Sequence, residues 1–156
     1  MIGLSTGLRM AIVSNYGLGA MMNGGIIRIY DGMRPISPDM PPSGTELARV
    51  TTNGAVWHPD TDPNNAGLIV QVVAPGALMN AGAWRMKGIT TGVATWFRWC
   101  WSATDPEHES VFYPRIDGDV DVVDGEADLV LLSTNITPTI DWEIDSFLFV
   151  LPMGDA

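Results

Sequence analysis

Three residue types that often carry chemistry are scarce in this sequence: it has one cysteine, two histidines and one lysine. The single cysteine, Cys100, excludes an internal disulfide, and its position between Trp99 and Trp101 predicts a buried thiol without reactivity. The histidines, His58 and His108, lack the neighbouring His or Cys ligands that a zinc site requires. Neither is placed by a local motif to activate a nucleophile. We therefore expect neither an enzyme nor a cofactor.

Long apolar runs are also missing. No stretch approaches the ~20 apolar residues of a membrane-spanning helix, and the first segment, Met1–Met22, lacks the charged start and continuous apolar run of a signal peptide. A phosphate-binding loop and a dinucleotide fingerprint are absent as well. These absences predict a protein made in a cytoplasm, without a membrane partner.

Positive charge is scarce. The chain has 18 acidic and 8 basic residues, for a net charge of −10, which disfavours contact with nucleic acid or anionic membranes. Only 17% of residues are charged, and 46% are hydrophobic. Such a composition fits either an apolar surface covered by partners or a core rich in Met and Ala. The acidic bias also fits a saline environment, and the sequence does not separate these explanations.

A helix is predicted near the start of the chain. Ser5 or Thr6 is a suitable N-cap, apolar residues follow at helical spacing, and Gly17 and Gly19 are expected to end the helix. We assign residues 1–22 to this helical segment.

The rest of the chain, residues 23–156, has the pattern of short strands separated by turns. Four prolines in Arg34–Ser43 predict a loop. In the last apolar segment the alternation changes phase near Ser146, which predicts a bulge or bend. The whole chain, residues 1–156, is expected to be one all-β domain: antiparallel sheets in a β-sandwich or jelly-roll-like arrangement, with one short N-terminal helix. The expected strands are Ile26–Tyr30, Glu46–Thr52, Leu68–Val73, Ala83–Ile89, Val93–Trp101, Val111–Ile116, Ala127–Ser133 and Thr139–Leu151.

One acidic stretch is a weak candidate for calcium. Asp117, Asp119, Asp121 and Asp128 have part of the spacing of a calcium-binding loop. However, Val122 occupies the position where such a loop needs glycine, and the flanks are predicted strands. We therefore favour a solvated hairpin loop.

Six tryptophans are many for this length, and Trp96 and Phe97 are adjacent, so they point to opposite faces of a strand. One aromatic face must then be covered by the N-terminal helix, by other parts of the domain or by a partner. Tryptophan is enriched at interface centres, whereas packing inside the core and binding of sugars remain alternatives. The interface candidates are Trp57, Trp84, Trp96, Phe97, Trp99 and Trp101.

Short segments in a fixed order along nearly the whole chain carry a resemblance. They are Gly7–Arg9, Gly25–Tyr30, Ser43–Ala48, Ala94–Trp99, Arg115–Val120, Asp128–Leu131 and Ile144–Phe147. In this order they resemble a family of small virion structural proteins of tailed bacteriophages and prophages. The acidic stretch departs from the shorter polar turn of that family.

The resemblance implies a non-enzymatic virion component with no catalytic residues. The role that fits best is a capsid decoration or cement protein, on the outer surface of the phage head, bridging shell subunits. Its expected partners are the major capsid protein and like subunits, in a homotrimer. A tail, neck or baseplate component is an alternative, and so is a carbohydrate-binding module for adsorption to the host.

Overall fold

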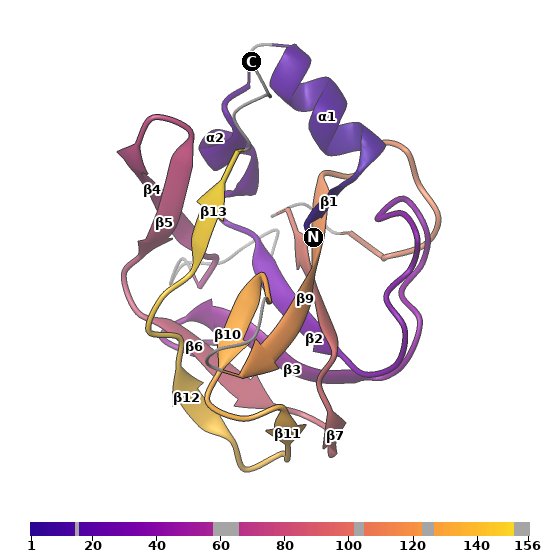
Figure 1. Cartoon of the computed structure of the whole chain (residues 1–156), viewed down its shortest axis with the longest axis vertical. Helices are drawn as coiled ribbons and strands as arrows, with labels where there is room; N and C mark the ends of the chain where they lie inside the picture. Colours follow the sequence, from indigo (N-terminus) through magenta and orange to yellow (C-terminus); the bar gives the residue numbers. More distant parts are fainter. Residues whose placement is uncertain (15, 58–65, 102–104, 123–126, 152–156) are drawn as a thin grey trace.

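The computed structural model describes residues 1–14, 16–57, 66–101, 105–122 and 127–151. These residues are mostly β, with 43% in strands and 10% in helices, and the strands form antiparallel sheets (Figure 1). The predicted dominance of antiparallel β-structure is therefore confirmed.

The largest sheet has eight strands in the order β1-β9-β8-β2-β3-β6-β12, and β10 pairs with β9. All neighbours are antiparallel except β9 and β10, which are parallel. The middle strands β2 and β8 are almost wholly buried on both faces, which explains their nearly continuous apolar sequences. The strands are β1 (Gly3–Leu4), β2 (Ile26–Tyr30), β3 (Glu46–Thr52), β6 (Trp84–Gly88), β8 (Trp96–Cys100), β9 (Arg115–Val122), β10 (Leu129–Leu131) and β12 (Asp141–Glu143).

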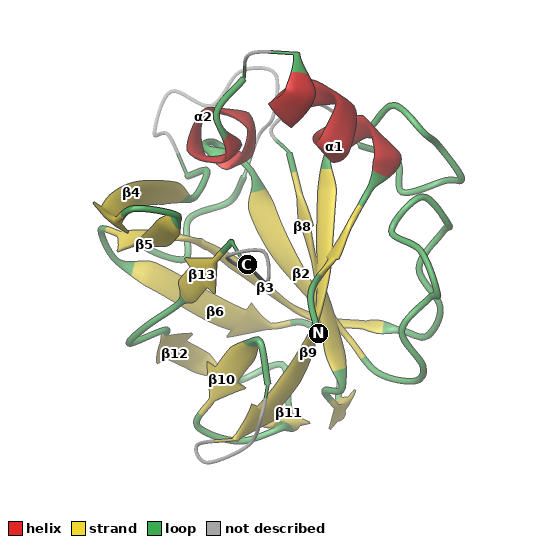
Figure 2. Cartoon of the chain, turned by 45° about the horizontal axis from the view of Figure 1, so that its top comes forward, coloured by secondary structure: helices red, strands yellow, loops and turns green. Residues whose placement is uncertain are grey.

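Two smaller sheets complete the β-structure. The first joins β4 (Ile69–Ala74), β5 (Ala77–Ala81) and β13 (Leu148–Val150) in the order β13-β5-β4, and the second pairs β7 (Gly92–Val93) with β11 (Asn135–Ile136). In Figure 2 the three-stranded sheet lies beside and in front of the large sheet.

An aromatic cluster joins the large sheet to the segment that enters β13. The ring centroid of Phe147 lies 5.4 Å from that of Trp84, 5.6 Å from that of Trp99 and 6.1 Å from that of Phe97. The last two contacts are edge-to-face, which is a favourable arrangement of aromatic rings. This cluster is the centre of the core.

The N-terminal segment contains two helices, not one. Helix α1 (Thr6–Val13) is capped by Ser5, as predicted. Helix α2 (Leu18–Met22) begins after Gly17, whose extended backbone makes it the N-cap of the second helix rather than the end of the first. The helix breaks between them because Ser, Asn, Tyr and Gly, which follow α1, are weak helix formers. Neither helix among the described residues has the length and apolar character needed to cross a membrane.

Several predicted strands differ in their limits. The strand expected at Val93–Trp101 divides into β7, which ends at Val93, and β8, and these two strands belong to different sheets. The strand expected at Val111–Ile116 begins at Arg115, because Pro114 has no N–H to donate to a neighbouring strand. The strand expected at Thr139–Leu151 divides into β12 and β13, in different sheets, with the break at the predicted change of phase. The sequence analysis did not predict β5.

Candidate functional site

Most of the aromatic interface candidates lie inside the protein. Trp84, Trp96 and Phe97 have no exposed surface, and Trp99 is 2% exposed. For these four the interface hypothesis was wrong, because other parts of the same chain cover them. Trp96, Phe97 and Trp99 lie on β8, and Trp84 lies on β6. Trp57 and Trp101 are half-buried and keep some surface.

Loops of the chain itself, rather than a helix, cover the second face of β8. Trp96 stacks on Tyr30 with ring centroids 4.5 Å apart, and its Nε1 donates to the Asp31 carbonyl at 3.1 Å. Two loops cross this face: residues 31–45, which include the predicted proline-rich loop, and residues 105–114. We call this region the covered face.

Three ion pairs lie beneath these loops. Arg98 and Asp117 form a two-fold hydrogen bond, with both contacts at 2.7 Å and almost no exposed surface. Arg115 binds Asp105 in the same way, at 2.6 and 2.7 Å. The third pair joins Arg28 Nη1 to Glu107 Oε2 at 2.6 Å. In these three pairs each positive group has one negative partner.

Arg98 and Arg115 also donate hydrogen bonds to backbone carbonyls of the loops. Arg98 Nη1 donates to the Met40 carbonyl at 3.0 Å, and Arg115 Nη1 donates to the Pro38 carbonyl at 3.0 Å. Arg115 Nη2 also donates to the His108 carbonyl at 2.9 Å. Arg98 thus joins a carboxylate of the sheet to the loop backbone, and Arg115 joins a carboxylate of one loop to the backbone of both loops. These contacts are structural.

Burial shifts the ionisation of several groups on the covered face. Burial, followed by the charges of Glu107 and Asp105, raises the pKa of the Cys100 thiol well above its usual range. Burial and the adjacent Glu107 carboxylate likewise raise the pKa of Tyr30. Burial also raises the pKa of Asp117, and Arg98 opposes this rise. Cys100 is therefore a poor nucleophile, as predicted.

Residues 3–7, before and at the start of helix α1, form a serine pattern that the sequence analysis missed. Gly3 to Gly7 has the spacing Gly-x-Ser-x-Gly of a hydrolase nucleophile, and Ser5 lies between a strand and a helix. However, Ser5 is fully buried. Its Oγ donates to the Tyr113 carbonyl and accepts from the N–H groups of Leu8 and Arg115. All three hydrogen-bonding positions of the hydroxyl are used, so Ser5 is a helix cap and a link to β9.

The acidic stretch is not the hairpin loop that we favoured. Asp117, Asp119 and Asp121 belong to strand β9, because alternate carboxylates leave Ile116 and Val120 free to face the core on the other side. Asp117 binds Arg98. Asp119 Oδ1 lies 3.3 Å from Arg34 Nη1, and Asp128 Oδ2 accepts a hydrogen bond from the Asp119 N–H. Residues 123–126 lie outside the described residues.

No group of three potential ligands for a metal ion occurs in the described part of the chain. The ring centroids of His108 and Tyr113 lie 5.9 Å apart. His58 lies outside the described residues.

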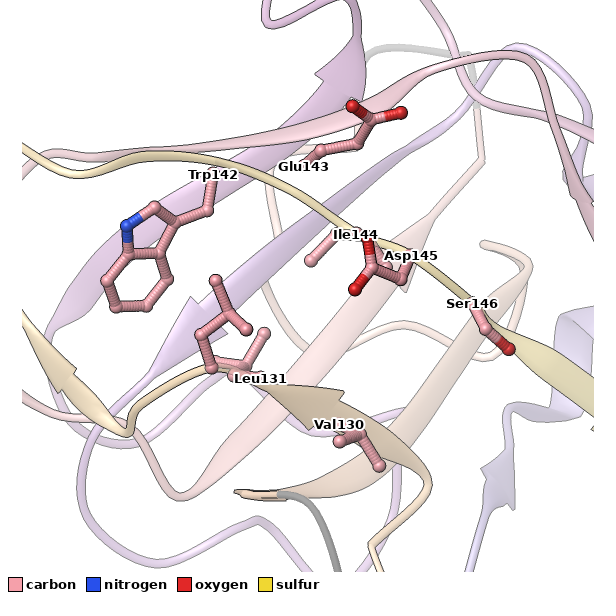
Figure 3. Close-up of a pocket in the computed structure, with 8 residues that line it drawn as sticks. Val130, Leu131, Trp142, Glu143, Ile144, Asp145 and Ser146 are labelled. Atoms are coloured by element: carbon pink, nitrogen blue, oxygen red, sulfur yellow. The ribbon is translucent and has the colours of Figure 1, made fainter.

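A cavity of about 280 Å³ opens beside β10 and β12. In Figure 3 the indole of Trp142 and the side chain of Leu131 lie along one wall, Asp145 lies further along the segment, and Glu143 points away. Trp142 is half-buried, while Asp145 and Ser146 are exposed. The cavity offers an apolar wall with a carboxylate at its margin, and none of the predicted site residues lines it.

The end of the molecule that holds α2, β4, β5 and β13 (Figure 1) carries exposed apolar side chains. On the outer face of the three-stranded sheet, Val150 is 56% exposed, Leu148 52% and Ile69 38%. Val72, on the opposite face, is 75% exposed. Because such clusters are uncommon on isolated proteins, this surface is a candidate interface.

In the comparisons with known proteins, no family model, curated protein or solved structure matches the chain.

Proposed function

We propose that the chain is a non-enzymatic structural protein of a tailed-phage virion, and that it serves as a capsid decoration or cement protein on the outer surface of the head. The observation that carries this proposal is the exposed apolar surface formed by β4, β5 and β13 with the neighbouring helices. A partner that covers this surface removes apolar area from water, which stabilises the assembly. The sequence resemblance supplies the choice of a virion.

The covered face supports the same role. Three arginines and three carboxylates hold two long loops against the sheet. The Cys100 thiol donates to Glu107 Oε1 at 3.7 Å, but it is fully buried beneath these loops. A rigid body with fixed loops suits a protein that bridges subunits, whereas catalysis needs an accessible polar site. For the fold, we propose that the large sheet and the three-stranded sheet form the two layers of a β-sandwich of the jelly-roll type, joined by the Phe147 cluster.

The proposal predicts binding to the capsid exterior and mechanical reinforcement. Heads assembled without the chain are mixed with purified protein, and bound copies are counted by quantitative mass spectrometry. We expect many copies per head and a higher temperature of head rupture. Binding at only a few copies, at a neck or tail, would support a tail, neck or baseplate role instead. No binding to heads or tails would exclude a virion role.

A second candidate function has one observation in its favour. The cavity wall formed by Trp142, with Asp145 at its margin, has the combination of aromatic surface and carboxylate that sugars bind, through stacking and hydrogen bonds to hydroxyl groups. Trp84 is fully buried, so its indole has no surface on which a sugar could stack. A glycan array compares the wild type with Trp142→Ala and, as a control, Trp57→Ala. Binding that only Trp142→Ala abolishes would support an adsorption module.

A further inference from the structure

Charged residues are distributed unevenly along the chain. Several stretches of the chain contain no charged residue, among them residues 129–140. Three others are residues 10–27, 63–84 and 146–154. The described parts of these three segments come together in space, because α1 packs on α2, α2 packs on β4, and β5 joins β4 to β13. Figure 1 shows these elements at the upper end of the molecule. We call this region the uncharged end.

The uncharged end presents apolar side chains from each of its parts. Val13 on α1 is 86% exposed and Tyr16 59%. On the three-stranded sheet, register pairs Leu148 with Met79, and Met79 with Gln71, so these three side chains share the outer face. Gln71 is the one strongly polar side chain in this row. The outer face is therefore apolar and without charge.

A small hollow lies within this surface. It has a volume of about 130 Å³ and is formed by α2 and the β4–β5 hairpin, together with Leu151. Its walls include Leu18, Val72 and Leu78. A hollow with apolar walls accepts an apolar side chain from a neighbouring molecule.

Strand β4 also offers an open edge. The Val70 N–H points away from β5, since it donates to the Asn23 side chain at 2.9 Å. Alternate residues of a strand direct their N–H groups to the same side, so the Val72 N–H points the same way. No strand among the described residues pairs with β4 on this side. Among the described residues, the edge is thus covered at Val70, and no strand pairs with it at Val72.

We propose that the uncharged end is an interface between copies of this chain. Two copies with a net charge of −10 each repel one another wherever their acidic surfaces meet. The uncharged end is the surface on which a copy meets a copy without opposing like charges. A basic partner would be drawn to the acidic remainder of the surface instead. The biological purpose of this interface rests on the proposed function. The interface itself can be tested with the purified chain alone.

The test is sedimentation velocity of the purified full chain over a range of concentrations. The wild type is compared with the double variant Val72→Glu/Val150→Glu, which places two carboxylates on the uncharged end. The matched control is Ile36→Glu, because Ile36 is 97% exposed and lies on the covered-face loop, away from this end. Thermal unfolding of each variant checks that the fold is retained.

We expect the wild type and Ile36→Glu to form oligomers, and the double variant to associate about 100-fold more weakly, since unpaired carboxylates are costly to bury. Added salt should strengthen wild-type association, because it screens the repulsion between acidic copies. A wild type that stays monomeric at every concentration and salt would overturn the inference, as would a double variant that associates normally. A monomer that sediments with phosphatidylcholine vesicles would overturn it too, in favour of a lipid surface. If the chain stays monomeric but still reinforces heads, this inference fails and the proposed function stands. If the chain forms oligomers that never bind a virion, this inference stands and the proposed function fails.

Discussion

Arg98 and Asp117 sit side by side on neighbouring strands and share a two-fold ion pair with almost no access to solvent. Both residues were part of sequence patterns that suggested other roles: the aromatic strand for Arg98 and the acidic stretch for Asp117. The pair explains both patterns. An arginine among aromatics needs a buried partner, and the first aspartate of the acidic stretch supplies it.

Removing one member of this pair should destabilise the protein strongly. Asp117→Asn leaves the Arg98 guanidinium buried without a counter-charge, and we expect a loss of about 3–5 kcal/mol in the free energy of unfolding. Urea denaturation measures the change. The control is Arg85→Ala, which removes an exposed ion pair with Asp141 and should cost no more than about 1 kcal/mol. Equal losses in the two variants would contradict a buried pair.

Alkaline pH should weaken the fold through Cys100 and Tyr30. Their pKa values are raised in the folded protein, so their contribution to stability is present below the unfolded pKa values and is lost as pH rises toward the folded ones. The loss begins above the ordinary cysteine pKa of 9.0. Cys100→Ala should reduce the slope of stability against pH by up to about 1.4 kcal/mol per pH unit. Urea titrations at a series of alkaline pH values measure this slope, and an unchanged slope would show that the thiol ionises freely in the folded state.

Ser5 should act on stability and not on catalysis. Ser5→Ala leaves the N–H groups of Leu8 and Arg115 and the Tyr113 carbonyl without their shared partner, and we expect a loss of about 1–3 kcal/mol in unfolding free energy. Chemical denaturation gives this value. In parallel, the wild type is treated with a fluorophosphonate probe. Covalent labelling at Ser5 would identify a nucleophile and refute the cap assignment.

Gly44 should be hard to replace. Its φ of +87° favours glycine, and a Cβ there would lie 2.2 Å from the Asp31 carbonyl oxygen. Gly44→Ala should therefore destabilise the covered-face loop by more than Gly82→Ala, because Gly82 has a similar φ of +71° but open space around it. Thermal unfolding compares the two variants. A larger loss in Gly82→Ala would show that the loop does not pack against Asp31 as described.

Local patterns predicted the regular parts of the fold well. The strand at Glu46–Thr52 has the predicted limits, and the Ser5 cap begins the helix as expected. These features depend on residues close together in the chain. Strand β5, in contrast, has the sequence Ala-Leu-Met-Asn-Ala, whose residues have little intrinsic preference for strands. It forms because β4 and β13 pair with its two edges, which no local pattern reveals.

The placement of the site residues depended on long-range contacts. The sequence indicated correctly that Trp96 and Phe97 point to opposite faces, but it did not show that loops would cover the second face. Proline-rich segments rarely cover a sheet through regular pairing, so their role becomes visible only through contacts such as that of Arg98 with Met40. The uncharged end was missed for a similar reason. Its three segments are far apart in the sequence and meet only in the fold.

The central claim is that apolar surface left bare on the isolated chain is covered in an assembled particle. Hydrogen exchange read out by mass spectrometry tests it directly, by comparing the purified chain under dissociating, dilute conditions with the chain bound to phage heads. We predict slower exchange in the particle at β4 and β13, with little change in the already covered β8 and β9. Unchanged exchange at β4 and β13 in a particle that carries the chain would contradict the account.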